Sequence, residues 1–223
     1  MTLTLPDGTT VSALLDVPPS PRCSYVFAHG AGAGMMHSFM GAFARELGAH
    51  GVATLRYQFP YMERGSRRPD PPKVAHAAVR AAVEEAQRLL PDVALFAGGK
   101  SFGGRMTSQA YAASPMPGVR GLVFVGFPLH PAGKPGVERA DHLRQVDVPM
   151  LFLSGTRDEL AELSLLQPLA GRLGARATLR LYDDADHSFH VPARSGRTDA
   201  QVRQAMAADA AAWMEQAQAA AKR

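Results

Sequence analysis

The amino-acid sequence predicts an α/β fold, with a mainly parallel central sheet, helices on both of its faces and no large lid. Short apolar runs of the kind that form buried strands alternate with longer segments at helical spacing. That alternation is typical of parallel strands joined by helical crossovers. Glycine-rich segments follow two of the apolar runs directly, where such a sheet has its loops. No linker or repeat interrupts the chain, so we expect residues 1–223 to form one domain.

The composition is that of an ordinary globular protein. Apolar residues make up 46% and charged residues 20% of the sequence, and a chain of 223 residues can bury a substantial core without disulfides. Cys23 is the only cysteine, which excludes an internal disulfide and suits a reducing cytosol.

The charge pattern does not favour nucleic acid as a partner. The formal net charge is +4 and the sequence pI about 9.5, but the charges are scattered, with Arg67-Arg68 the densest spot. Residues 1–10 lack the basic start and apolar run of a signal peptide, and no apolar stretch approaches the roughly 20 residues that span a bilayer. We therefore expect a cytoplasmic protein without membrane partners, of unknown oligomeric state.

The first half of the chain predicts an edge hairpin followed by alternating strands and helices. Residues 2–5 alternate polar and apolar, Pro6-Asp7-Gly8 is a turn signal, and a second strand-like run follows at 11–17. The later patterns predict a strand at 24–28, a glycine-rich loop, a helix at 38–49, a strand at 52–57, a loop at 60–72 and a helix at 74–90.

The second half continues the alternation. The patterns predict strands at 94–97, 122–125, 149–153 and 178–181, with helices at 104–113, 159–173 and 199–220. The last helix is rich in alanine, but Val202, Met206 and Trp213 give it an apolar face for packing. The segment 126–148 is too short and too rich in proline and glycine for a helical lid, so we expect a shallow, open pocket.

The stretch FAGGKSFGGR, residues 96–105, allows two interpretations. The phosphate-loop pattern G-x-x-x-x-G-K-[ST] fits only its end, because its first glycine would fall on Ala94, inside a predicted strand. Strand N–H groups are engaged in the sheet and are not free to hold phosphates. The pattern G-x-S-x-G fits completely from Gly99 to Gly103, with a strand before it and a helix after it. We therefore interpret Ser101 as a nucleophile raised on a tight turn.

The partners of such a serine follow it in the order acid, then histidine. Asp158 comes just after one predicted strand, and His187 lies in the loop after the last one. The carboxyl ends of parallel strands share one edge of the sheet, so these loops can meet there. For the oxyanion hole we choose the backbone N–H groups of Phe102 and Ala31, with Gly32 as the alternative to Ala31.

Plainer interpretations exist for several of these residues. Ser101 could be an ordinary turn serine, Asp158 could only cap a helix, and His190 could replace His187. Asp184 and Asp186 stand so close to His187 in sequence that we expect them to shape its loop. Structural or surface roles are expected for His29, His37, His50, His76, His130 and His142.

Other residues near the motifs receive less specific interpretations. The histidines have no metal-ligand spacing, so we expect no metal and no cofactor. We expect Lys100 to be exposed to solvent, although it could bias the site toward acidic substrates. Residues 35–40 could line an acyl pocket, but we favour packing of the first helix.

Together these segments resemble the α/β-hydrolase superfamily, and within it the small lidless hydrolases grouped with dienelactone hydrolases and testis-expressed-30-like proteins. The resemblance covers the chain nearly end to end. Dienelactone hydrolases proper use a cysteine nucleophile, where this chain has Ser101. The resemblance is carried by AHGAGAGM (28–35), GGKSFGGR (98–105), GFPLHPAGKP (126–135), LFLSGTRDEL (151–160) and DADHSFH (184–190).

The resulting hypothesis is a serine hydrolase that cleaves small, soluble carboxyl esters or thioesters through an acyl-enzyme on Ser101. His187 would act as the base and Asp158 would orient it. The alternative is a non-catalytic scaffold of the same fold that acts by binding proteins, since some testis-expressed-30-type relatives are subunits of complexes.

Overall fold

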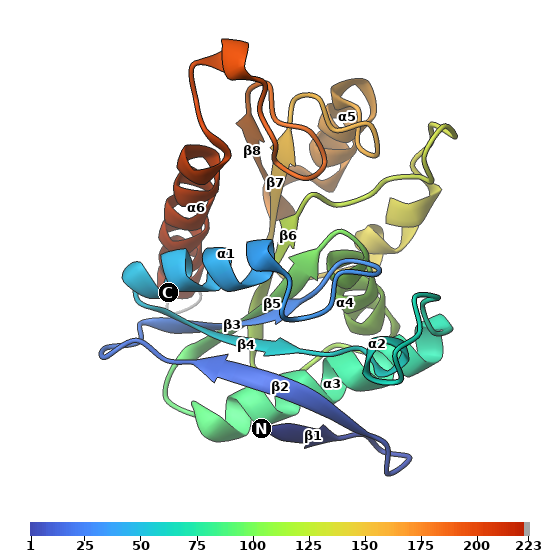
Figure 1. The fold of residues 1–223 in the computed structure, drawn as a ribbon, viewed down its shortest axis with the longest axis vertical. Coiled ribbons are helices and arrows are strands. Elements are labelled where there is room, and N and C mark those ends of the chain that lie inside the picture. The colour runs from blue at the N-terminus through green and yellow to red at the C-terminus, as the bar shows by residue number, and fades with distance from the viewer. Residues whose placement is uncertain (221–223) are drawn as a thin grey trace.

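The computed structural model describes residues 1–220 and contains one eight-stranded sheet (Figure 1). The strands are β1 (Thr2–Thr4), β2 (Thr10–Asp16), β3 (Cys23–Ala28), β4 (Val52–Tyr57), β5 (Ala94–Lys100), β6 (Val119–Val125), β7 (Met150–Gly155) and β8 (Ala177–Tyr182). Their order in space is β1-β2-β4-β3-β5-β6-β7-β8. The β2 strand pairs antiparallel with β1 and β4, and the pairs from β4 through β8 are parallel. The predicted fold class and its edge hairpin are confirmed.

Helices cover both faces of the sheet. One face carries α1 (Ser38–Ala49) and α6 (Asp199–Ala220), which contact each other, and the opposite face carries α3 (Pro72–Leu89), α4 (Phe102–Ala113) and α5 (Leu163–Leu173) (Figure 1). Each face has its own cluster of buried apolar side chains. Parallel strands buried on both sides need such clusters, because neither of their faces meets water.

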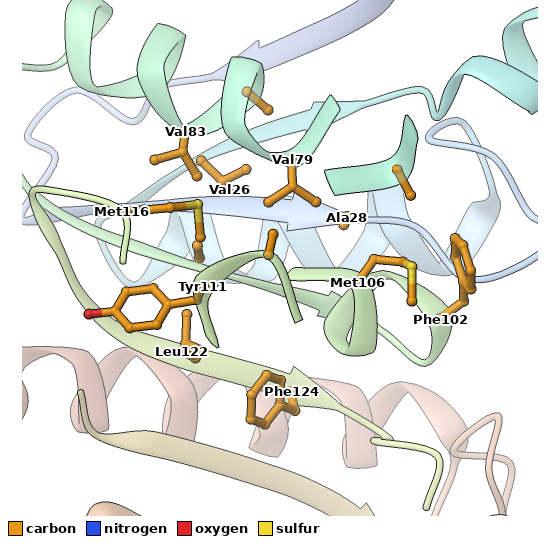
Figure 2. Packing of buried hydrophobic residues seen from close by; sticks show 14 of the residues in the cluster. Val26, Ala28, Val79, Val83, Phe102, Met106, Tyr111, Met116, Leu122 and Phe124 are labelled. Atoms are coloured by element: carbon orange, nitrogen blue, oxygen red, sulfur yellow. The ribbon is translucent and has the colours of Figure 1, made fainter. Parts of the chain in front are cut away.

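The cluster under α3 and α4 fixes the middle of the sheet. Figure 2 shows Val79 and Val83 of α3 close to Val26 of β3, with Met106 of α4 in the same layer. These side chains are almost fully buried, as is Leu122 of β6. Packed side chains on this face therefore hold α4, and with it the turn from β5, against the sheet.

One predicted loop contains a short helix. The sequence predicts a loop at 60–72, but Pro60–Glu63 forms the short helix α2, and α3 begins at Pro72. Proline suits a helix start, because the N–H that it lacks would have no helical partner there.

Two boundaries near the carboxyl edge also differ from the prediction. The β5 strand continues through Gly98 and Gly99 to Lys100, because its backbone pairs with β3 and β6 along this length. The helix predicted at 159–173 begins at Leu163. Residues 158–161 form a turn instead, in which the Ala161 N–H donates to the Asp158 carbonyl oxygen.

The segment between β6 and β7 carries no helical lid. Its regular structure is the 3-10 helix η1 (Glu138–Gln145), which packs against α4. The carboxyl edge of β5 thus stays open on this side. Within residues 1–220, no helix is both long and apolar enough to cross a membrane.

Candidate active site

Ser101 occupies the tight turn between β5 and α4. Its backbone has φ 49° and ψ −112°, a conformation that a side chain disfavours. Lys100 ends the strand and Phe102 begins the helix, so the turn consists of Ser101 alone. A strained backbone at a strand-to-helix turn is the geometry that the G-x-S-x-G pattern predicts.

The flanking glycines allow the turn to sit against β3. A Cβ at Gly99 or at Gly103 would lie 2.5 Å from the carbonyl oxygen of Ala28. Real Cβ atoms do not approach an oxygen so closely, so only glycine fits at either position. Their absent side chains bring β3, β5 and α4 together directly under Ser101.

His187 and Asp158 join Ser101 in one chain of hydrogen bonds. The His187 Nε2 lies 2.8 Å from the Ser101 Oγ, and the His187 Nδ1 lies 2.9 Å from each carboxylate oxygen of Asp158. The Asp158 side chain is fully buried, whereas that of His187 is 23% exposed. The Asp158 Oδ1 also accepts the Leu160 N–H at 2.9 Å. Asp158 follows β7 and does not cap α5, whose N-cap is Glu162.

The loop that carries His187 is organised by Asp186. The Asp186 Oδ1 accepts the N–H groups of Ser188 at 2.7 Å and His190 at 3.0 Å. The Asp184 N–H donates to the Thr156 Oγ1, which ties the same loop to the end of β7. These aspartates shape the loop, as predicted, and the acid that contacts His187 is Asp158.

The sequence predicts that Lys100 is exposed to solvent, but in the structure its side chain is covered. Its Nζ donates to the backbone oxygen of His187 at 2.6 Å and lies 5.3 Å from the ring centroid of Phe189. Burial lowers the pKa of this ammonium to about 8. The prediction is wrong because the loop after β8 covers the side chain, and nothing in the local sequence around Lys100 indicates that contact. Lys100 therefore links the serine turn to the histidine loop.

The two predicted oxyanion donors line the same cavity as Ser101. Within residues 1–220, the N–H groups of Ala31 and Phe102 donate to no other group. The Gly32 N–H instead donates to the Tyr61 Oη at 3.0 Å, which leaves Ala31 as the better of the two alternatives. The sequence did not single out Tyr61, because it lies in the segment predicted as a loop.

His29 holds the loop that contains Ala31. Burial lowers the pKa of His29 to about 4, so the ring is neutral. Its Nδ1 donates to the Gly30 carbonyl oxygen at 2.8 Å, and its Nε2 accepts the Phe59 N–H at 3.1 Å. This is the structural role that the sequence predicts.

Two cavities meet at Ser101. The first has a volume of about 300 Å³ and its walls include Ala33, His37, Phe39, Met40 and His187. The second, of about 380 Å³, extends over Phe102 toward Arg105 and Arg139. A larger cavity of about 580 Å³ lies along α3 and shares no lining residue with these two.

The structure also places His190, the alternative to His187, and Met40, a possible pocket residue. His190 is exposed and its Nδ1 lies 2.9 Å from the Asp199 carboxylate, so it does not replace His187. Met40 packs in the core of the α1 face, as favoured from the sequence, but Met40 and Phe39 also line the first cavity.

Comparison with known proteins gives a family and a set of similar folds. A model of the alpha/beta hydrolase domain family matches residues 21–215. A dienelactone hydrolase from Anabaena variabilis is 19% identical, with a TM-score of 0.77 over 97% of this chain and 95% of that one. A serine hydrolase without a lid from Xanthomonas campestris is 22% identical, with a TM-score of 0.74 over 96% and 93%. The esterase domain of a Rhodothermus marinus protein is 20% identical, with a TM-score of 0.68 over 95% and 96%. At these identities the likeness to solved structures establishes the fold.

Proposed function

Because the chain belongs to the alpha/beta hydrolase domain family, we propose that it is a serine hydrolase that cleaves small, soluble carboxyl esters or thioesters. The observation that carries this proposal is the hydrogen-bonded series from Asp158 through His187 to Ser101. An activated serine needs a base within hydrogen-bond reach and a group that orients the base. Both conditions are met at the open carboxyl edge of the sheet.

The first half of the reaction forms an acyl-enzyme. The His187 Nε2 takes the Ser101 proton as the Oγ attacks the substrate carbonyl carbon, and the carbonyl oxygen becomes an oxyanion. The N–H groups of Phe102 and Ala31 stabilise that oxyanion. As the tetrahedral intermediate collapses, His187 gives its proton to the leaving alcohol or thiol. Asp158 keeps the Nδ1 proton in place and stabilises the charged imidazolium.

The second half returns the enzyme to its starting state. His187 takes a proton from a water molecule, whose oxygen attacks the acyl carbon. The same N–H groups hold the second oxyanion. His187 then protonates the Ser101 Oγ, and the carboxylic acid leaves. No cofactor or metal is needed in this scheme, and that remains a prediction, as do the single domain and the cytoplasmic location.

A fluorophosphonate probe tests the proposal. Only an activated serine reacts quickly with such a probe, so we expect one adduct, on the peptide that contains Ser101. Mass spectrometry of the digested protein locates the adduct, and Ser101→Ala is the control that should not be labelled. An unlabelled wild-type protein, or an adduct that persists in Ser101→Ala, would favour the non-catalytic scaffold instead.

A further inference from the structure

The second cavity beside Ser101 contains two arginine side chains. Its lining includes Phe102 and Met106 of α4 together with Pro128 and Leu160, and both Arg105 and Arg139 line it as well. The Arg105 guanidinium lies 5.8 Å from the ring centroid of Phe102, the residue after the serine. Both arginines therefore line the same cavity as Ser101.

Neither arginine has a carboxylate partner. Among residues 1–220 no acidic oxygen lies within 4.0 Å of Arg105 or Arg139, and the buried Arg105 Nε has no hydrogen-bond partner. The Arg139 Nη1 donates to the His130 carbonyl oxygen. Burial lowers the pKa of both guanidinium groups, and the charge of Arg139 lowers that of Arg105 further. Such groups gain stability when an anion approaches them.

The carboxylate in the same cavity does not neutralise them. Asp70 lines the cavity, and its Oδ1 accepts from the Arg64 Nη2 at 2.5 Å. Arg64 and Asp70 thus balance each other, which leaves the charges of Arg105 and Arg139 uncompensated. An anion in this cavity would face an excess of positive charge, and among the described residues that line the cavity the one opposing group is the Asp70 Oδ2, which is buried and has no hydrogen-bond partner.

The geometry of the reaction assigns the cavity to the acyl side of the substrate. His187 lines the first cavity and must protonate the leaving oxygen or sulfur, so the alcohol or thiol leaves on that side. The oxyanion points toward Ala31 and Phe102. The remaining substituent of the tetrahedral carbon is the acyl chain, and the second cavity, which Ser101, Ala31 and Phe102 all line, is the space left for it in this scheme.

We propose that the second cavity binds a carboxylate at the far end of the acyl chain, so that the substrates are monoesters or monothioesters of dicarboxylic acids. Arg105 supplies the principal contact and Arg139 the supporting charge. A planar guanidinium fork matches a carboxylate, and hydrogen bonds between charged groups are stronger than neutral ones. This inference rests on the proposed hydrolase function, because the direction of the acyl chain follows from His187 and the oxyanion donors.

A matched pair of activated esters tests the inference. We compare kcat/KM for the 4-nitrophenyl monoester of adipic acid with that for the same ester whose distal carboxyl is capped as a methyl ester. In the wild type the free acid should exceed the capped ester by about tenfold or more, the value of a hydrogen bond to a charged group. Arg105→Gln should reduce that ratio about tenfold, and Arg105→Lys should retain part of it. The control Arg88→Gln removes an exposed charge on α3 and should leave the ratio unchanged.

The outcomes separate this inference from the proposed function. Equal kcat/KM values for the two esters, in a protein that the fluorophosphonate labels at Ser101, would overturn the carboxylate subsite and leave the hydrolase intact. If neither ester is turned over, calorimetry with adipate decides. Binding by the wild type that weakens in Arg105→Gln supports the subsite, and no binding at millimolar adipate overturns it.

Discussion

The identity of the acid depends on which carboxylate the His187 imidazole meets. Three aspartates lie near this histidine in sequence or in space, and each has a different set of contacts. Both carboxylate oxygens of Asp158 lie 2.9 Å from the ring Nδ1. The Asp186 Oδ1 instead accepts hydrogen bonds from two backbone N–H groups of its own loop. The contacts predict that only Asp158 controls the tautomer of the imidazole.

At this scale we predict that Asp158→Asn loses nearly all activity. The amide of asparagine can donate to Nδ1, which stabilises the tautomer with the proton on Nε2, and that tautomer cannot accept the Ser101 proton. In serine proteases the corresponding change costs on the order of 10⁴ in kcat. We would measure kcat on one activated ester and check the fold by circular dichroism.

Asp186→Asn is the matched control, since an asparagine oxygen can still accept from the two N–H groups. It should cost less than about tenfold, the value of one weakened hydrogen bond. If Asp158→Asn keeps most of its activity while Asp186→Asn loses it, our choice of the acid is wrong.

The sequence predicts some of these residues better than others. Ser101, Asp158 and His187 could be chosen because motif and chain order constrain them. The burial of Lys100 and the arginine pair at Arg105 and Arg139 could not, because these depend on contacts between segments far apart in the chain. Local patterns describe neighbours in sequence, and a cavity is formed by neighbours in space.

At the scale of elements, the site depends on how closely β3, β5 and α4 approach one another. A Cβ at Gly103 would lie 2.5 Å from the Ala28 oxygen and 2.7 Å from the His29 oxygen, both of which are backbone atoms that cannot move aside. Gly171 in α5 has no neighbouring atom within 4 Å of its Cβ position. An added methyl group would therefore clash with backbone at Gly103 and would meet no neighbouring atom at Gly171.

We predict opposite signs for the two alanine substitutions. Gly103→Ala should lower the free energy of unfolding by about 3 kcal/mol or more, because α4 must move away from β3, and overpacking of this kind costs about 1–3 kcal/mol even where side chains can yield. Gly171→Ala should raise it by about 0.5–1 kcal/mol, the difference in helix propensity. Urea unfolding at neutral pH measures both. A Gly103→Ala protein as stable as the wild type would show that the close approach is not required.

The boundaries of the elements illustrate where propensity fails. The observed ranges of α1, β4 and α6 are those that the sequence predicts. The Gly98-Gly99 pair reads locally as a turn, yet it lies in β5 because β3 and β6 pair with it on either side. A Cβ at Gly98 would lie 1.8 Å from the Val123 oxygen, so this glycine serves the spacing of the strands. Strand pairing is a non-local property that composition does not reveal.

In the molecule as a whole, the segment between β6 and β7 leaves the sheet edge at Ser101 open. The segment between β6 and β7 contributes the helix η1 and no lid, and the two cavities at Ser101 have volumes of about 300 and 380 Å³. No lid from this segment closes over the two cavities, so we expect a short acyl group to contact the protein and the far end of a long one to extend into water. The shape of the molecule, more than any single residue, should limit the length of neutral substrates.

We therefore predict that kcat/KM for a series of 4-nitrophenyl esters rises with acyl-chain length only among the short chains. Each methylene that enters an apolar pocket is worth about 0.8 kcal/mol, or roughly fourfold in kcat/KM. That gain requires a wall to contact, and a methylene that remains in water gains nothing. We would measure kcat/KM from acetate to decanoate, below the concentrations at which the longer esters form micelles. The values should level off or fall beyond the short chains. A fourfold rise per methylene that continued through octanoate would require an enclosed tunnel, which would contradict the open edge described above.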